Sequence, residues 1–212
     1  MDTLERLSEC VISGDDGQAA RLAREAIDAG TPAKRILDDG LIRGMNTVGQ
    51  RFKAHEIFLP DVLMAARAMY AGMDLLRPLL IQEDVPSLGR VVIGTVQGDL
   101  HDIGKNLVGI LLKGAGFEVI DLGHDVAPER FVDEALVHDA PVIGMSALLT
   151  TTMPVMQRVV DLVRQRGLSG RIRTIVGGAP VSEDYARQIG ADGYGFDAAN
   201  AVDTVRALIS EN

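Results

Sequence analysis

Tryptophan is absent from the 212-residue chain, aromatic residues make up only 4 %, and Cys10 is the sole cysteine. A single cysteine cannot form an intrachain disulfide, which fits a protein of a reducing compartment. So few aromatic rings exclude a platform on which nucleic-acid bases stack. Positive charge is also scarce, because 21 Lys and Arg residues face 30 Asp and Glu residues and leave a net charge of −9. Such a chain repels phosphate backbones and anionic lipids, so neither nucleic acid nor a membrane is an expected partner.

Long hydrophobic runs are missing as well. The longest uncharged stretch, residues 140–157, contains Ser146, Thr150 and Pro154 and is therefore a poor membrane span. The N-terminal residues 1–5 are acidic and lack the features of a signal peptide. The composition that is present, with 47 % apolar and 24 % charged residues, is typical of a globular protein with a real core. We therefore expect a folded, cytoplasmic protein.

The N-terminal part, up to about residue 81, shows apolar residues at helical spacing. Asp15 is placed to cap the start of a helix, and Gly30 stands where a C-terminal cap glycine is expected. Thr31 followed by Pro32 is typical of the start of the next helix, which extends to about residue 52. A further helix is expected from about residue 60. Short connections between such helices predict an antiparallel bundle of about four helices.

A polar segment, residues 83–89, separates this part from a region of different periodicity. It contains Pro86 and Gly89, which interrupt regular structure. We expect a helical domain over residues 1–84, a linker over residues 85–89 and a second domain over residues 90–212. The linker is also the expected hinge between the two domains.

Downstream of the linker, short apolar runs alternate with helical patterns. The expected strands are residues 91–96, 118–121, 141–145, 173–176 and 193–195. The expected helices are residues 103–115, 128–137, 154–166, 182–188 and 198–209. Strands that alternate with helices form right-handed crossovers and a parallel, doubly wound sheet. The predicted fold class is α/β: a four-helix bundle followed by a flavodoxin-like, five-stranded parallel sheet of order 2-1-3-4-5.

Unusual polar and small residues follow three of the expected strands. They are Asp99, His101 and Gly104 after the first, residues 146–152 after the third, and Gly177-Gly178 after the fourth. Ligands of such a sheet bind beyond the carboxyl ends of the strands, where the strand order reverses. The pair Asp99-x-His101 admits two interpretations. Either His101 ligates a metal while Asp99 holds its other ring nitrogen, or His101 is a loop residue and Asp99 caps the next helix.

Other ligand types fit the sequence less well. The four histidines are His55, His101, His124 and His138. They show no paired metal-ligand spacing and Cys10 is remote, so a zinc or iron site is disfavoured. A phosphate-receiver domain needs an aspartate where Ser146 stands, and a flavin phosphate loop is richer in Ser and Thr than residues 97–101. A metal at His101 would have to arrive in a cofactor that supplies its own equatorial ligands.

Two sets of motifs resemble a known family. Asp99-x-His101-x-x-Gly104, Ser146-x-Leu148 and Gly177-Gly178 are similar to the cobalamin-binding signature. In the N-terminal part, Gly44-Met45-Asn46-x-Val48-Gly49 and Phe58-Leu59-Pro60 are similar to the helical cap of methionine synthase. Nearly the whole chain is covered. It therefore resembles the small corrinoid proteins of methyltransferase systems, which consist of the cap and the cobalamin-binding domain.

This resemblance implies roles for individual residues. His101 would be the lower axial ligand of the cobalt, Asp99 would hydrogen-bond His101, and Thr152 stands where the third member of this relay, often serine, stands. The other residues implied to hold the cofactor are Asp102, Ile103, Gly104, Ser146, Leu148, Thr150, Gly177 and Gly178. Phe52 and Leu59 would cover the methyl group above the cobalt, and they share one side of the chain if their segment is helical.

The resemblance implies that the protein carries a methyl group. Cob(I)alamin would accept the methyl group from a substrate-specific methyltransferase and pass it to a second methyltransferase, with a reductive activator as a further partner. The chain would then be the corrinoid subunit of a multi-component enzyme, not catalytic alone. The alternative is a cobalamin-dependent sensor or photoreceptor module.

Two points stay open in the sequence. Proteins of this type serve methanol, methylamines, methoxylated aromatics and betaines, so the methyl donor is not indicated. His55 stands where relatives usually have glycine, and it either reaches toward the upper face of the cofactor or is solvated at a helix end.

Overall fold

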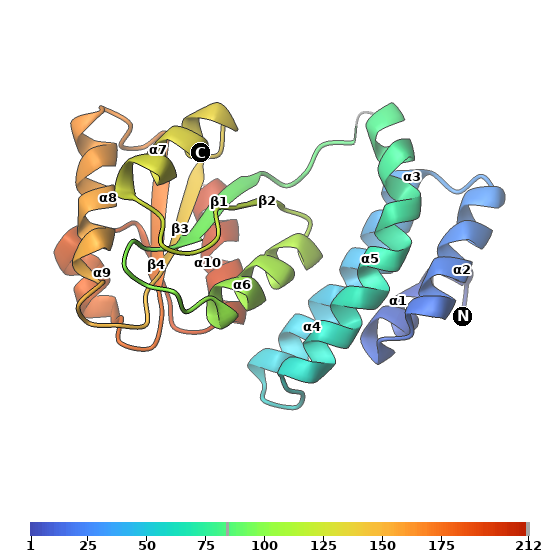
Figure 1. Ribbon diagram of the computed structural model, residues 1–212. Coiled ribbons are helices and arrows are strands. Elements are labelled where there is room, and N and C mark those ends of the chain that lie inside the picture. Colours follow the sequence, from blue (N-terminus) through green and yellow to red (C-terminus); the bar gives the residue numbers. More distant parts are fainter. Residues whose placement is uncertain (84, 211–212) are drawn as a thin grey trace. The chain divides into compact units, whose positions relative to one another are not determined.

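The computed structural model describes residues 1–83 and 85–210, which form two compact units (Figure 1). The first unit contains Met1–Pro86 together with Gly114–Gly116, and the second contains the rest of the chain. The predicted domain limits at residues 84 and 90 stay a prediction. Asp84 and the two C-terminal residues of the predicted second domain lie outside the described residues.

The first unit is helical, as predicted. Its elements are α1 (Thr3–Ser13), α2 (Asp16–Asp28), α3 (Ala33–Arg35), the π-helical segment η1 (Ile36–Ile42), α4 (Arg43–Lys53) and α5 (Leu59–Gln82). Because α3, η1 and α4 follow one another without a break, they act as one long helix, and α5 packs against α1 and α2. The wider π turn within this helix was not predicted. Along the described parts of the chain, no helix is both long and apolar enough to cross a bilayer.

Two of the predicted helix ends are confirmed and one is wrong. The Asp15 carboxylate caps α2 by accepting a hydrogen bond from the Gln18 amide at 3.0 Å, and Gly30 follows α2 with a left-handed φ of 73°. Thr31, however, is not the N-cap of the next helix. The N-cap of α3 is Pro32, which has no side-chain group that can accept a hydrogen bond from the helix. Instead, the Ala33 amide lies 3.1 and 3.2 Å from the two carboxylate oxygens of Glu83, beyond the end of α5.

The connection between α4 and α5 corrects the geometry expected for Phe52 and Leu59. These residues would share one side only in a continuous helix, but α4 ends at Lys53 and α5 begins at Leu59. Between them, His55 has a left-handed φ of 57°, which explains why glycine suits this position. The two side chains, both half-buried, therefore stand on either side of a turn.

The second unit confirms the predicted parallel sheet of order 2-1-3-4-5. Its strands are β1 (Arg90–Thr95), β2 (Glu118–Asp121), β3 (Val142–Ser146), β4 (Arg173–Gly177) and β5 (Gly193–Gly195). Its helices are α6 (Ile103–Gly114), α7 (Pro128–Val137), α8 (Pro154–Gln165), α9 (Glu183–Ile189) and α10 (Ala198–Ser210). Figure 1 shows α7 and α8 along one face of the sheet, with α6 and α10 along the other.

An apolar core fills the space between the sheet and helices α7 and α8. Buried Phe131, Met156 and Val159 of the helices pack against Val92 and Ile143 of the strands, among other apolar residues. The strands are in register at their carboxyl ends, because Thr95 pairs with Ser146 and Ser146 pairs with Gly177. The loops that follow β1, β3 and β4 consequently leave the same edge of the sheet at the same level.

Candidate functional site

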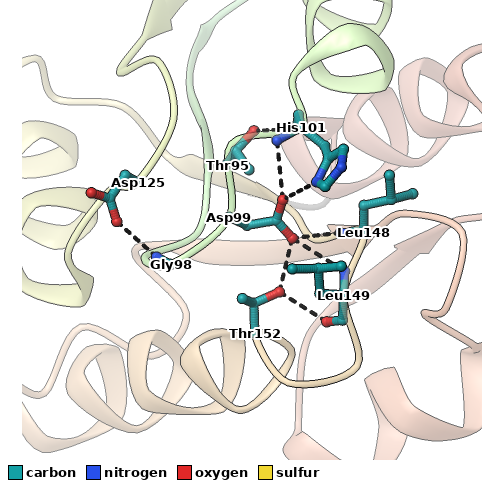
Figure 2. Close-up of polar contacts among 8 residues, drawn as sticks. All are labelled: Thr95, Gly98, Asp99, His101, Asp125, Leu148, Leu149 and Thr152. Carbon is teal, nitrogen blue, oxygen red and sulfur yellow. Dashed lines mark hydrogen bonds and ion pairs between the residues drawn. The ribbon is translucent and has the colours of Figure 1, made fainter.

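A buried carboxylate, Asp99, lies at the centre of this edge (Figure 2). Its Oδ2 accepts hydrogen bonds from the Leu148 amide at 2.8 Å, the Leu149 amide at 3.2 Å and the Thr152 hydroxyl at 2.8 Å. Its Oδ1 accepts a hydrogen bond from the His101 amide at 3.1 Å and lies 2.8 Å from His101 Nδ1. Asp99 thus joins the loop after β1 to the loop after β3.

Asp99 is ionised at neutral pH. Burial raises the pKa of this carboxyl, but the hydrogen bonds from Leu148, His101 and Thr152 outweigh that effect and hold its pKa well below the usual range. The resulting negative charge beside His101 Nδ1 assigns the ring proton to this nitrogen. The lone pair of the other ring nitrogen, Nε2, is then free for a ligand, and the imidazole is 52 % exposed. This is the usual arrangement of a histidine that ligates a metal.

The interpretation of Asp99 as the cap of the next helix is wrong. Helix α6 begins only at Ile103, and the amide bound to Asp99 Oδ1 is that of His101, which precedes the helix. The first α-helical hydrogen bond of this turn runs from the Asn106 amide to the Asp102 carbonyl. The Asp99 carboxylate therefore binds the amide and the imidazole of His101 and not the amides of α6.

Two residues that hold this loop were not predicted from the sequence. Thr95, fully buried at the end of β1, donates its hydroxyl hydrogen bond to the His101 carbonyl at 3.0 Å. Asp125, from the loop after β2, accepts a hydrogen bond from the Gly98 amide at 2.7 Å. A hydroxyl directly after the buried apolar residues 91–94 was the available signal for Thr95, whereas the contact of Asp125 bridges separate loops and leaves no local pattern.

The first turn of α6 is anchored by an ion pair. Lys105 is 4 % exposed, and its ammonium lies 2.6 Å from both carboxylate oxygens of Asp121 at the end of β2. The same ammonium donates a hydrogen bond to the Asn106 side chain at 2.6 Å. A buried ammonium requires such partners, so this end of α6 is fixed to β2 close to the His101 loop.

The structure brings most of the predicted site residues to this one edge. Ser146 ends β3, and exposed Leu148 and Thr150 follow it in the loop that leads to buried Thr152. The residues placed at the start of α6 and at the end of β4 are Asp102, Ile103, Gly104, Gly177 and Gly178. Phe52 and Leu59 belong to the first unit, so their contact with a cofactor stays a prediction.

Close packing explains why positions 177 and 178 are both glycine. A Cβ on Gly178 would lie 1.9 Å from the Ala147 carbonyl oxygen, and one on Gly177 would lie 2.9 Å from the Gly195 carbonyl oxygen. The loop after β3 can approach Gly178, and the end of β5 can approach Gly177, only because these positions carry no side chain. The pair is therefore required by the fold before any ligand is considered.

The chemistry of this edge fits a largely apolar macrocycle that carries a metal. Large apolar side chains are exposed in the loops after β1, β3 and β5 and at the start of α6, and the loop after β1 also carries the imidazole whose Nδ1 is already bound. They are Leu100, Ile103, Leu148, Leu149 and Phe196, with exposed fractions of 66 %, 72 %, 42 %, 41 % and 62 %. Apolar surface gathered around a few polar groups is typical of cofactor sites. The residues present therefore suit a corrinoid.

Comparisons with known proteins give the same result over both units. Family profiles described as B12 binding domains match residues 3–77 and residues 89–203. A corrinoid protein of Desulfitobacterium hafniense is 38 % identical over 100 % of this chain and 99 % of its own length. Trimethylamine corrinoid protein 1 of Methanosarcina mazei is 40 % identical over 98 % of this chain and 97 % of its own length.

Among solved structures, the methanol:cobalamin methyltransferase complex MtaBC of Methanosarcina barkeri contains a similar chain. The match has a TM-score of 0.87 at 31 % identity and covers 99 % of this chain and 80 % of that one. A cobalamin-binding protein from Desulfitobacterium hafniense matches with a TM-score of 0.80 at 31 % identity, over 98 % of both chains. With a buried Asp99 that binds His101 at the carboxyl edge of its sheet and B12-binding profiles over both of its units, the chain belongs to the family of corrinoid proteins.

Proposed function

We propose that this protein is the methyl-carrying corrinoid subunit of a methyltransferase system. The observation that carries the proposal is the buried network in which Thr152 donates to Asp99 and Asp99 holds His101 Nδ1. Such a network presents one neutral imidazole nitrogen to an incoming metal. The names of the relatives, a trimethylamine corrinoid protein and a methanol:cobalamin methyltransferase complex, support methyl transfer as the purpose of the site.

Different residues of the chain would contact different parts of the cofactor. His101 would hold the cobalt through Nε2, while Asp99 fixes the orientation of the ring and keeps the proton on Nδ1. Ser146, Leu148 and the glycine pair would line the path of the cofactor's tail, and Thr150 would contact the corrin. Asp102, Ile103 and Gly104 would contact the cofactor at the start of α6. When bound, the corrinoid supplies a cobalt centre that takes up and releases a methyl group.

We infer two methyltransferase partners, one specific for the methyl donor and one for the acceptor, and a reductive activator as a third. We propose methanol or a methylamine as the methyl donor, because these compounds appear in the names of the relatives. Phe52 and Leu59 would shield the methyl group, and residues 85–89 would allow the helical domain to move away during transfer. A cytoplasmic location fits the single cysteine.

The proposal is tested by reconstituting the protein with hydroxocobalamin, reducing it, and adding one donor together with its methyltransferase. Methanol and mono-, di- and trimethylamine are compared with the matching enzymes. We expect one corrinoid per chain and, for one donor only, conversion to the visible spectrum of the methylated cofactor. A protein that retains no corrinoid on gel filtration would contradict the proposal.

Gly104 provides a separate prediction, because folding does not require a glycine there. Within the described part of the chain, no atom outside its own turn lies within 4 Å of a Cβ at this position in the first turn of α6. Gly104→Ala is expected to leave the free energy of unfolding of the cofactor-free protein unchanged or raise it by about 0.5 kcal/mol. If Gly104 lies against the corrinoid, the Kd for hydroxocobalamin rises about tenfold, which a spectroscopic titration measures. An unchanged Kd would remove Gly104 from the cofactor site.

A further inference from the structure

The loop between β2 and α7 contains a strained residue next to the His101 loop. Asp125 has a left-handed φ of 55°, a conformation that side-chain-bearing residues rarely adopt. The loop runs beside the end of β1, where the Thr95 amide donates to the Gly123 carbonyl at 2.9 Å and the Val126 amide donates to the Thr95 carbonyl at 3.0 Å. Such strain persists only where the surrounding contacts determine it.

Asp125 contacts the His101 loop with both its side chain and its backbone (Figure 2). Its Oδ1 accepts a hydrogen bond from the Gly98 amide at 2.7 Å, and its own amide donates to the Asp99 carbonyl at 3.1 Å. The two bonds bracket the peptide group between Gly98 and Asp99. Asp125, in its left-handed conformation, thus binds the two peptide groups on either side of that one, through its side chain and through its amide.

We propose that Asp125 is a positioning residue for the axial ligand: its bonds to Gly98 and Asp99 hold the loop that aims His101 at the cobalt. The inference rests on the proposed function and adds to it a residue outside the Asp99–His101–Thr152 network. The side chain of Asp99 is fixed by the loop after β3, and its backbone is bound by the Asp125 amide and by the Val96 carbonyl, which accepts from the Asp99 amide at 3.1 Å. Without the Asp125 carboxylate, the Gly98 amide loses its partner and the peptide before Gly98 can rotate, so the loop that carries the imidazole is held less firmly.

The test compares Asp125→Gly with a matched control, Asp139→Gly. Glycine adopts positive φ freely, so Asp125→Gly removes the carboxylate without adding backbone strain. Asp139 also has a left-handed φ, 49°, but it follows α7 and its carboxylate pairs with Arg171. Both variants therefore remove an aspartate from the same backbone conformation, and only the first touches the His101 loop. Asp125→Asn is the rescue variant, since an amide oxygen still accepts from Gly98 and asparagine tolerates this conformation.

The readout is the midpoint potential of the Co(II)/Co(I) couple in protein reconstituted with cobalamin, together with the electron paramagnetic resonance spectrum of the Co(II) form. If His101 ligates Co(II) more strongly than Co(I), weaker ligation by His101 would make reduction of the cobalt easier. For Asp125→Gly we expect the equilibrium constant for ligation of Co(II) to fall about tenfold, which raises the potential by about 59 mV. Asp139→Gly and Asp125→Asn should stay near the wild-type potential and keep the splitting from one axial nitrogen.

Equal potentials for Asp125→Gly and Asp139→Gly, with the nitrogen splitting intact in both, would overturn the inference while leaving the proposed function in place. Equal shifts in both variants would also overturn it, because the effect would then come from general loosening. A wild-type protein that shows no axial nitrogen would contradict the proposed role of His101 itself, so the two failures are distinguishable.

Discussion

Replacement of His101 by alanine is expected to abolish nitrogen ligation of the cobalt while the protein still folds and retains corrinoid. The side chain is 52 % exposed, and the backbone contacts of residue 101 with Asp99 and Thr95 survive the substitution. Loss of the imidazole removes the donor atom that the buried Asp99 holds in place. The visible spectrum of protein reconstituted with methylcobalamin should change from a six-coordinate, nitrogen-ligated form in the wild type to a form without axial nitrogen.

His138→Ala is the matched control for this experiment. His138 is also a surface histidine paired with a carboxylate, since its Nε2 lies 3.4 Å from Glu134 Oε2, and its side chain is 41 % exposed. It belongs to the end of α7, away from the carboxyl edge of the sheet. We expect this variant to keep the wild-type spectrum. Nitrogen ligation that persists in His101→Ala would show that another residue, or the cofactor's own base, occupies the axial position.

Gly178→Ala is expected to destabilise the second unit by at least about 3 kcal/mol. The added Cβ would lie 1.9 Å from the Ala147 carbonyl oxygen and 2.9 Å from the Ala147 carbonyl carbon, so backbone must move to admit it. The position also has a φ of 128°, which residues with a side chain avoid. Because the displaced loop leads to Leu148 and Thr152, the contacts of Asp99 are lost together with the packing. Urea unfolding followed by circular dichroism measures the loss.

Gly167→Ala separates the steric clash from the cost of the backbone conformation. Gly167 has a φ of 69°, but none of residues 1–83 and 85–210, apart from its chain neighbours, has an atom within 4 Å of a Cβ placed there. Its substitution should cost about 1 kcal/mol, the penalty of the left-handed conformation alone. If Gly178→Ala is no more destabilising than Gly167→Ala, the close approach of the two loops does not limit stability.

Patterns that act over a few residues predicted the fold well. Alternating apolar and helical segments predicted the order of the strands. Asp15 caps the start of α2 and Gly30 follows its end, as local capping rules predict. The rules failed where a distant residue takes over, as Glu83 does at the start of α3 in place of Thr31. They also failed within α3–η1–α4, since helical periodicity does not distinguish a π turn from an α turn.

The site shows the same division. The spacing Asp99-x-His101 indicated a contact that the structure contains at 2.8 Å, and the family resemblance placed Thr152 beside Asp99. The hydrogen bonds from the Leu148 and Leu149 amides to Asp99, and those of Asp125 with Gly98 and Asp99, were not predicted. Backbone donors carry no sequence signal, and a bond between two loops that are distant in the chain depends on the register of the strands between them.

The many hydrogen bonds to Asp99 affect how related sequences should be interpreted. Asp99 joins the loops after β1 and β3 through Leu148, Leu149 and Thr152, so natural selection for a stable fold alone would preserve it. The His101 imidazole is half exposed and, among the described residues, its one hydrogen-bond partner is Asp99. A descendant of this protein that gave up its cofactor would keep the aspartate and lose the histidine first. In genome surveys, position 101 is therefore the informative marker of a working corrinoid protein.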